Sequence, residues 1–397
     1  MEKILKNKTV VLGVTGSIAA YKIANLARML VKQHCEVHVL MTQNATNFIN
    51  PITFETLTKH KCLIDTFDRN FEFSVEHVAL AKAADVVMIA PASANVIGKI
   101  ANGIADDMLT TTVMACPCKK IVSPAMNHNM FHNPIVQDNI EKLKHYGYEI
   151  VEPAHGMLAN GDMGDGRMPD EELLFEYIVK EIAFEKDMTG KKVLVTAGAT
   201  VEAIDPVRFI TNHSSGKMGF ALAKNAMLRG ADVTLVMGKC DSEPPVFVNT
   251  VKVQSAKDMY DAVIERADSM DIIVKAAAVA DYRPKNVSSE KVKKQDGNMS
   301  IELERTDDIL KTLGERKNSQ FICGFSMETE NMLENSRKKL EKKNCDMIVA
   351  NNLKQDGAGF GGNTNIVTLI TKDDEVQLEK MTKDEVAEKI FDFILSR

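Results

Sequence analysis

The chain has 397 residues, of which 45% are hydrophobic and 26% charged, and its formal net charge at pH 7 is −6. This length is too great for one ordinary hydrophobic core, so we expect two domains of roughly 150 to 200 residues each. The acidic balance and the lack of a long apolar stretch argue against a nucleic-acid-binding protein and a membrane-spanning one, because the first needs concentrated positive charge and the second about 20 consecutive apolar residues.

The first half of the sequence has the pattern of a parallel α/β sheet. Residues 9–14 predict a strand, which a Thr-Gly-Ser turn joins to an amphipathic helix over 18–30 and a second strand over 36–41. Apolar runs at 85–91, 120–126 and 148–154 predict three further strands. Strands that alternate with helical or loop segments favour a parallel sheet covered on both faces.

Polar residues cluster directly after three of these strands, at Thr15 to Ser17, Ser93 to Asn95, and Asn127. Ligands of open α/β sheets bind beyond the carboxyl ends of the strands, so we expect a ligand at this edge.

The first turn, Gly13-x-x-Gly16-Ser17, favours a mononucleotide over NAD. It lacks the G-x-G-x-x-G fingerprint, and the second strand ends at Met41-Thr42 without a ribose-binding acid. Backbone N–H groups at a helix start can hold a phosphate, and FMN fits that requirement. A glycine that serves only the strand-to-helix geometry explains the turn equally well.

Three histidines are candidate functional residues. His77 opens an amphipathic helix before the strand at 85–91, and on the sequence alone a structural histidine is favoured over a catalytic one. His128 and His132 have the spacing of a helical metal pair, but no third ligand is apparent and Pro134 follows, so we predict no zinc site.

The strand pattern restarts after a charged, turn-containing stretch at 184–192, which predicts a linker between a domain of residues 1–184 and one of 190–397. A strand and loop at 192–200, a helix closing on Gly230 and a strand at 232–238 predict a second nucleotide-binding-like fold. Further strands are expected at 271–278, 321–326 and 346–352, with a closing hairpin from 366–371 and 376–380. The seven cysteines show no Cys-x-x-Cys spacing, which predicts reduced thiols in a cytoplasmic protein.

Long motifs in both halves resemble known enzymes. The segments GVTGSIAAYK, EHVALAKAADVVMIAPASANVIGKIANGIADDML, PAMNHNM and GDMGDGRM resemble the homo-oligomeric flavin-containing cysteine decarboxylases. The segments DPVRFITNHSSGKMG, AAAVADYRP and EKVKKQ resemble phosphopantothenate-cysteine ligases. Together, in this order, they cover nearly the whole chain and resemble the bifunctional enzymes of coenzyme A biosynthesis.

For the first domain this resemblance implies a flavodoxin-like, FMN-dependent phosphopantothenoylcysteine decarboxylase that forms trimers. The FMN ligands would be Gly16, Ser17, Thr42, Ser93 and Asn95. His77 would be the active-site base, and Asn127 and Met130 would hold the amide and carboxylate region of the substrate. A flavin is needed because the substrate carboxylate lies on a carbon without an electron sink, and oxidation of the neighbouring CH2–SH group to a thioaldehyde supplies one.

The family's flap, a loop that closes over bound substrate, corresponds to residues 158–168. Its glycines permit such motion, and closure would exclude water. Most of these decarboxylases carry Ala-Cys-Gly-Asp here, with the cysteine as proton donor in the final reduction, whereas this chain has Asn160 in the cysteine position. Asparagine has no proton to give near neutral pH, so we predict that carbon dioxide release survives and the last step is slow.

For the second domain the resemblance implies a Rossmann-like ligase that activates phosphopantothenate with CTP as an acyl-cytidylate, which cysteine then attacks. Asn212 would polarise the acyl-cytidylate, Arg208 would lie near the anionic substrate, and Lys291, Lys339 and Lys343 would bind CTP. A phosphate-binding turn would be formed by Ser214, Ser215, Gly216 and Gly219. Ala277, Asp281, Asp307, Asp308, Ile309, Leu310 and Phe325 would frame the nucleotide, although Asp307 stands where the family often has proline. Mg²⁺ would be held mainly by phosphate oxygens and water, without a dedicated protein cage.

The resemblance also implies ligase dimers, and trimers joined through dimers form a homo-dodecamer. Two alternatives to the bifunctional enzyme are a tandem NAD(P) oxidoreductase and a flavin-binding regulatory subunit. The missing fingerprint disfavours the first, and an intact His77 and Asn127 beside a complete ligase half disfavour the second.

Overall fold

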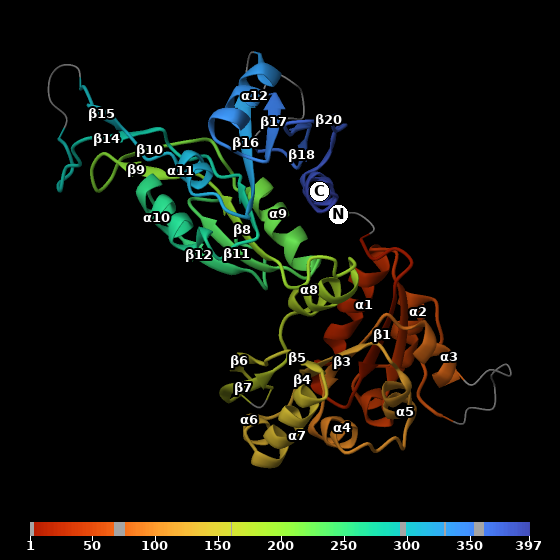
Figure 1. The fold of residues 1–397 in the computed structure, drawn as a ribbon. Helices are drawn as coiled ribbons and strands as arrows, with labels where there is room; N and C mark the ends of the chain where they lie inside the picture. The colour runs from red at the N-terminus through yellow and green to blue at the C-terminus, as the bar shows by residue number, and fades with distance from the viewer. Residues whose placement is uncertain (1–3, 67–75, 160, 294–298, 329–330, 353–360) are drawn as a thin grey trace. The chain divides into compact units, whose positions relative to one another are not determined.

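The computed structural model describes residues 4–66, 76–159, 161–293, 299–328, 331–352 and 361–397. The chain divides into two compact units, with the boundary between Phe184 and Glu185. Figure 1 draws the first unit in red to yellow-green and the second in green to blue. Each unit is an α/β structure built around its own sheet, as the sequence predicted.

The first unit has a five-stranded parallel sheet in the order β2-β1-β3-β4-β5. The strands are β1 (Thr9–Val14), β2 (Glu36–Met41), β3 (Val86–Ala92), β4 (Lys119–Pro124) and β5 (Glu149–Ile150). This order is that of flavodoxin-like folds, in which the chain reverses direction across the sheet between β1 and β3. Nearly all residues of β1 and β3 are buried, which is why their sequences are almost continuously apolar.

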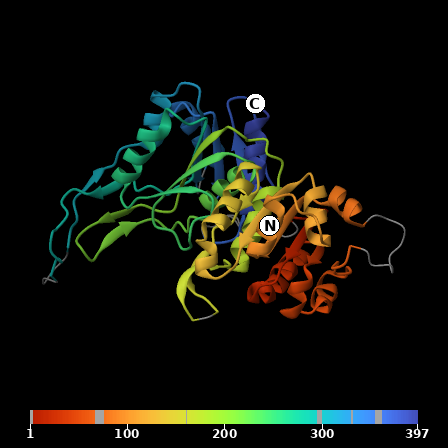
Figure 2. The same ribbon diagram turned by 90° about the horizontal axis from the view of Figure 1, so that it is seen from below.

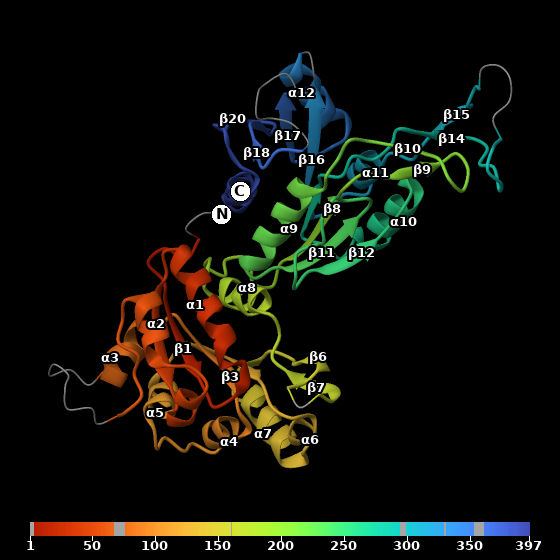
Figure 3. The ribbon, with the colours of Figure 1, turned by 180° about the vertical axis from the view of Figure 1, so that it is seen from behind.

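Helices cover both faces of this sheet (Figures 1 and 3). They are η1 (Ile18–Lys22), α1 (Ile23–Lys32), η2 (Gln43–Asn47), α2 (Pro51–Thr58), α3 (Glu76–Ala83), α4 (Ala94–Ala101), α5 (Met108–Ala115), α6 (His128–Phe131), α7 (Pro134–His145) and α8 (Glu171–Ile182). On one face, apolar residues of α3, α4, α5 and α7 pack with strand residues such as Val87 and Ile89 into one core. Full burial of each such side chain contributes about 1.5–3 kcal/mol.

The predicted strand at 148–154 is wrong in its second half. β5 ends at Ile150, and the chain then forms the antiparallel hairpin of β6 (Ala154–Met157) and β7 (Met163–Arg167), outside the main sheet. Only a short segment that contains Pro153 separates β5 from β6. The sequence pattern therefore does not distinguish the two strands from one continuous strand.

The second unit has an eight-stranded sheet in the order β12-β11-β8-β13-β16-β17-β19-β20. The strands are β8 (Lys192–Ala197), β11 (Asp232–Met237), β12 (Asn249–Lys252), β13 (Ile272–Lys275), β16 (Phe321–Glu328), β17 (Met347–Asn352), β19 (Val367–Ile370) and β20 (Glu375–Gln377). The first six strands are parallel and have the Rossmann order, with the switch point between β8 and β13. The predicted closing hairpin corresponds to β19 and β20, which pair antiparallel.

Among the described residues of this unit, the helices that flank the sheet are α9 (Lys217–Leu228), α10 (Ala256–Ala267), α11 (Ile309–Glu315), α12 (Met332–Lys342) and α13 (Lys383–Leu395). Two strand pairs, β9 (Val201–Ala203) with β10 (Phe209–Thr211) and β14 (Tyr282–Pro284) with β15 (Leu303–Arg305), run out from it as an arm, which Figure 2 shows from below. A third pair is β18 (Thr364–Asn365) with β21 (Met381–Thr382). None of the described helices is long and apolar enough to cross a membrane.

Candidate active sites

Thr15, which is fully buried, joins the two loops at the switch point of the first unit. Its hydroxyl donates to the carbonyl oxygen of Pro91 at 2.6 Å and accepts from the backbone N–H of Ser93 at 2.9 Å. The loop after β1 and the loop after β3 are therefore fixed to each other at the edge where ligands of such sheets bind.

The predicted FMN ligands gather at this edge, on loops that follow three neighbouring strands. Ser17, Thr42 and Ser93 are the N-caps of η1, η2 and α4, and each hydroxyl accepts from a backbone N–H of its own helix. Asn95 is exposed in the first turn of α4. A Cβ at Gly16 would come within 2.8 Å of the Cβ of Asn44, so the loops after β1 and β2 touch there. Three helix starts facing one edge form a suitable environment for an anionic ligand.

A cavity of about 480 Å³ lies beside these loops. Its lining residues come from η1, the turn before α6 and the β6–β7 hairpin: Ser17 to Ala19, Tyr21, Lys22, Ala125 to Asn127, Met157 to Ala159, and Gly166 to Met168. Asn127 caps α6, where its side-chain oxygen accepts from the N–H of Asn129 at 2.9 Å. The hairpin that carries the predicted flap is thus one wall of the same cavity as Ser17 and Asn127.

Of the described residues predicted for this site, only Ser17 and Asn127 line the cavity, whereas Gly16, Thr42, Ser93, Asn95, His77 and Met130 do not. Met130 lies on α6 with 49% of its surface exposed, and His77 is half-buried in the first turn of α3. Asn160, the residue in the position of the family's flap cysteine, lies outside the described residues.

Asp165 of β7 links the flap hairpin, which is the hairpin of β6 and β7, to α6 through hydrogen bonds. One carboxylate oxygen lies 2.9 Å from Nε2 of His132, and the other lies 2.9 Å from Nδ1 of His155 on β6. The backbone N–H of Asp165 also donates to Nδ1 of His128 at 3.1 Å. Hydrogen bonds from His155 and then His132 lower the pKa of Asp165. The third partner of the His128–His132 pair, which the sequence did not reveal, is therefore this carboxylate.

Glycines bring the hairpin close to the turn before α6. A Cβ at Gly164 would lie 2.7 Å from Nδ1 of His128, and one at Gly166, whose φ is 116°, would lie 2.3 Å from the carbonyl oxygen of Met126. These positions leave no room for a side chain. The glycines that the sequence predicted as sources of flexibility therefore also serve close packing.

The switch point of the second unit is held by two buried threonines in the same way. Thr196 accepts from the N–H of Ala277 at 3.1 Å, and Thr200 accepts from the N–H of Ala280 at 3.0 Å. Gly216 caps α9 with a φ of 81°, and a Cβ at Gly219 would lie 2.5 Å from that of Ala197. Gly219 thus lets α9 begin directly against β8, which leaves the turn at Ser214 to Gly216 at the strand edge.

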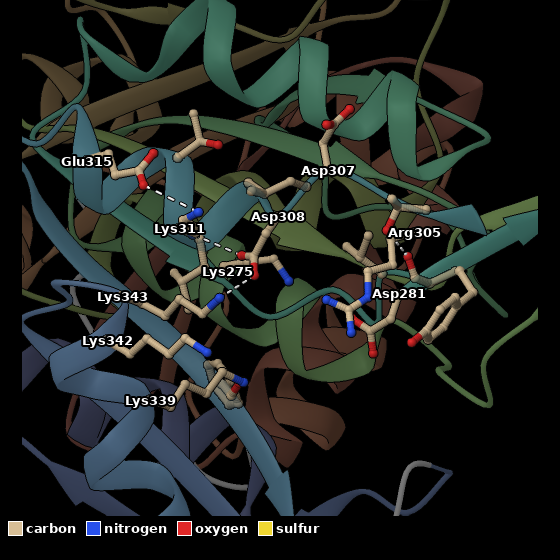
Figure 4. A pocket seen from close by; sticks show the side chains of 18 residues that line it. Lys275, Asp281, Arg305, Asp307, Asp308, Lys311, Glu315, Lys339, Lys342 and Lys343 are labelled. Atoms are coloured by element: carbon tan, nitrogen blue, oxygen red, sulfur yellow. Dashed lines mark hydrogen bonds and ion pairs between the residues drawn. The ribbon is translucent and has the colours of Figure 1, made fainter.

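Two adjoining cavities lie at this edge. The first, of about 710 Å³ (Figure 4), is lined by Asp281, Asp307 to Leu310, Phe325, Lys339 and Lys343 among others. The second, of about 540 Å³, is lined by Asn212, Ser214 to Gly216, Gly219 and Ala277, and it shares Asp281, Phe325 and Lys339 with the first. The structure therefore brings most of the predicted ligase residues together.

Positive charge converges on the first cavity. Lys343 forms an ion pair with Asp308, and Lys339 donates to the carbonyl oxygen of Phe325 at 2.9 Å. Burial opposes ionisation of Asp308, but hydrogen bonds from Lys343 and from the N–H of Lys311 outweigh it and lower the pKa of this carboxyl. Asp308 also caps α11, so the segment forms a regular helix start with Asp307 in the position of the family's proline.

Arg208 and Lys291 lie on the arm, and neither lines the two cavities. Arg208 pairs with the buried carboxylate of Asp205 and donates to the carbonyl oxygen of Val292 at 2.8 Å. The same carboxylate accepts from the N–H of Val292 at 3.1 Å. Hydrogen bonds from Arg208 hold the pKa of Asp205 well below its usual range. Asp205, which the sequence did not single out, therefore fixes the segment that carries Lys291.

Lys275 is a second residue that sequence reasoning missed, and it lines both cavities. The only signal in the sequence is a lysine at the end of an otherwise apolar strand, DIIVK.

Comparison with known proteins covers both units. Residues 1–183 match the model of the Flavoprotein family, and residues 188–397 match that of the DNA/pantothenate metabolism flavoprotein C-terminal domain. The coenzyme A biosynthesis bifunctional protein CoaBC of Bacillus subtilis (strain 168) is 48% identical over 93% of this chain and 92% of its own length. The protein of the same name from Borreliella burgdorferi is 40% identical over 97% of this chain and 98% of its own. A crystal structure of the C-terminal domain of a CoaBC protein is 49% identical, covers 52% of this chain and 95% of that one, and has a TM-score of 0.45.

Proposed function

Because the chain belongs to the family of coenzyme A biosynthesis bifunctional proteins, we propose that its two switch-point sites are the two active sites of that family. The chain is a bifunctional enzyme with a flavoprotein decarboxylase domain and a phosphopantothenate-cysteine ligase domain. One observation supports the assignment of both sites. In each unit, most of the residues implied by the family gather on loops that follow neighbouring strands at the switch point.

We assign the first site to the decarboxylase and FMN to its loops. The residues fit this cofactor because three hydroxyl-capped helix starts and the exposed Asn95 offer hydrogen bonds, while Gly16 leaves no side chain in the turn. When bound, FMN supplies two-electron oxidation of the substrate's CH2–SH group, which gives the neighbouring carboxylate an electron sink.

The chain's own residues then position the substrate and move protons. Asn127, at the cavity wall, would hydrogen-bond the amide region of phosphopantothenoylcysteine, and Met130 would pack beside it. His77 would take the thiol proton. The hairpin of β6 and β7 would exclude water when it closes, and Asn160 has no proton to donate at the end of the reaction.

We assign the two adjoining cavities of the second unit to the ligase. The phosphopantothenate carboxylate attacks the α-phosphorus of CTP and pyrophosphate leaves. The cysteine amine then attacks the acyl carbon, and CMP leaves with the electron pair of the broken C–O bond. The cavity with Lys339 and Lys343 suits the nucleotide, and the cavity with Asn212 and the turn at Ser214 to Gly216 suits the acyl group and the substrate phosphate.

Two residues predicted to bind phosphate groups in the ligase lie outside both cavities. Lys291 and Arg208 would act on the triphosphate or substrate phosphate through movement of the arm, since both lie outside the cavities in this structure. Mg²⁺ would be bound mainly by phosphate oxygens and water, without a dedicated protein cage.

The assignment is tested by the products formed from phosphopantothenate, cysteine and CTP, analysed by mass spectrometry. We expect pyrophosphate release that requires all three substrates, followed by carbon dioxide release from the ligated product. A protein that carries no flavin after reconstitution and releases no pyrophosphate from CTP would contradict it.

A further inference from the structure

Lys275 stands at the junction of the two ligase cavities. It is the last residue of β13, at the switch point beside β8, and its side chain lines both cavities. Figure 4 shows it among the labelled side chains of Asp308, which caps the start of α11, Lys339 on α12, and Lys343 at the end of α12. It was not among the residues that the family resemblance implied.

The Lys275 amine makes no hydrogen bond or ion pair with the part of the chain that the structure describes. This distinguishes it from its neighbours, since Lys343 pairs with Asp308 and Lys339 donates to the carbonyl oxygen of Phe325. An ammonium group has three donors, and a lysine kept only for packing would pair them with a carboxylate or a carbonyl. The donors of Lys275 are therefore available to a ligand.

The surroundings of this amine are costly for a positive charge. Burial and then the nearby Lys339 lower the pKa of Lys275 to about 8, and this is opposed by Asp308, Asp281 and Cys345. An anionic ligand would offset this cost by pairing with the ammonium form, which is how buried lysines serve phosphate sites.

On the basis of the proposed function, the position of Lys275 at the junction of the two cavities indicates which anionic group of the ligand it contacts. One cavity suits the nucleotide and the other suits the acyl group, so the group that spans their junction is the α-phosphate. That phosphate is attacked by the carboxylate in the first step and leaves with CMP in the second.

We propose that Lys275 is a further catalytic residue of the ligase, whose ammonium group donates hydrogen bonds to the α-phosphate oxygens of CTP and of the acyl-cytidylate. In the first step it stabilises the charge on phosphorus as the bond to pyrophosphate breaks. In the second step it stabilises the phosphate of departing CMP. The lysine keeps its proton throughout, and the proton that the cysteine amine loses on amide formation goes to solvent.

This role predicts a particular pH dependence of CTP binding. Lys275 loses its proton around pH 8 in the free protein, and a bound phosphate raises its pKa. CTP must therefore bind with proton uptake between about pH 8 and 9.5, and its affinity must fall as the pH rises through that range. The groups that face the amine and share in this titration are Lys339, Asp308, Asp281 and Cys345.

The test compares CTP binding and pyrophosphate release in the full-length enzyme and three variants, from pH 7 to 9.5. Lys275→Met removes the charge at similar volume, Lys275→Arg keeps a charge that does not titrate in this range, and Lys338→Met is the control on the exposed side of α12. We expect Lys275→Met to weaken CTP binding and to lower kcat/KM, each by roughly tenfold or more. We expect Lys275→Arg to bind CTP with an affinity that does not fall between pH 8 and 9.5.

Thermal unfolding of each variant distinguishes an altered fold from an altered site. The proposal is overturned if Lys275→Met is well folded and matches Lys338→Met in CTP affinity and turnover. It is also overturned if Lys275→Arg keeps the pH profile of the wild type. Failure of the proposed function gives a different result, because the wild-type enzyme itself would then neither bind CTP nor release pyrophosphate.

Discussion

At the scale of single residues, buried threonines hold both sites in shape. Thr15 connects the loops after β1 and β3, and Thr196 and Thr200 each accept from a backbone N–H that lies 80 or 81 residues further along the chain. A hydroxyl suits this position because it can donate and accept at once. No local pattern indicates this role, because threonine is also a common residue within strands.

Replacement of Thr15 by valine tests this role. Valine has the same shape, so the change leaves the carbonyl of Pro91 and the N–H of Ser93 buried without their partner. We expect the free energy of unfolding of the first unit to fall by about 1–3 kcal/mol, together with weaker FMN binding. Denaturant unfolding followed by flavin fluorescence measures both. Thr56→Val on the exposed face of α2 is the control, and an equal effect there would show that Thr15 has no special role.

Asn160 is the second residue with a testable consequence. A cysteine in its place would restore a proton donor for the last reduction, because a thiol titrates near neutral pH and an amide does not. We expect Asn160→Cys to raise the rate of phosphopantetheine formation by roughly 100-fold, with carbon dioxide release unchanged. Mass spectrometry of the products distinguishes the enethiol from phosphopantetheine. Normal reduction by the wild type, with Asn160→Ser behaving alike, would show that another group or water supplies the proton.

At the scale of elements, the sequence predicted the strands well and their terminal loops poorly. The apolar runs of β1, β3, β8 and β13 are buried on both faces, and such runs are visible without tertiary information. The flap segment was predicted as a loop because five of its residues are glycine or aspartate, yet half of it forms β7. Contacts with α6, which no local pattern encodes, determine that strand.

The same limit applies to the candidate sites. The family motifs led to residues such as Asn127, Asn212 and Lys343, and the fold gathers these at strand edges. Asp165 and Asp205 lie inside family motifs and Lys275 directly precedes one, but the resemblance assigned none of them a role. The roles of Asp165 and Asp205 come from partners 10 to 87 residues away in the sequence, and that of Lys275 comes from its position where two cavities adjoin.

The flap hairpin as an element depends on Asp165. Because hydrogen bonds from His155 and His132 lower the pKa of this carboxyl, its contribution is fully present above the ordinary aspartate pKa and is lost as the pH falls through the lowered value. We expect Asp165→Asn to increase hydrogen exchange of the backbone amides at 154–167 near neutral pH and to lower kcat/KM of the decarboxylase by roughly tenfold. Mass-detected exchange and carbon dioxide release measure these effects.

The control for this change is Glu172→Gln, which removes an exposed acid from α8 without touching the hairpin. Unchanged exchange in Asp165→Asn, or an equal increase in the control, would show that packing of Gly164 and Gly166 holds the hairpin without the carboxylate.

At the scale of the whole molecule, two sets of exposed apolar side chains lie on different units. Ile18, Tyr21, Phe48 and Ile52 are 46–59% exposed on η1, α2 and the end of η2, next to the proposed FMN loops. Val207, Phe209, Tyr282 and Leu303 are 45–58% exposed on or beside the arm. Clusters of this kind mark protein–protein contacts. The dodecamer expected from the resemblance, made of decarboxylase trimers joined by ligase dimers, would cover one set in each type of contact.

Charge introduced into each set separates the two contacts. By light scattering, we expect the wild type to have twelve times the 43.9 kDa mass of the chain. We expect Phe209→Glu to leave trimers that still bind FMN. We expect Ile52→Glu to leave dimers whose FMN binding is weakened. The reason is that an unpaired carboxylate buried in an apolar contact has a large desolvation cost. Ile135→Glu on α7, at a side chain that is 71% exposed outside both sets, must leave the mass unchanged. The two sets lie on separate units, so one set must form the trimer contact and the other the dimer contact. A wild-type monomer, or loss of the same contact in both variants, would contradict this arrangement.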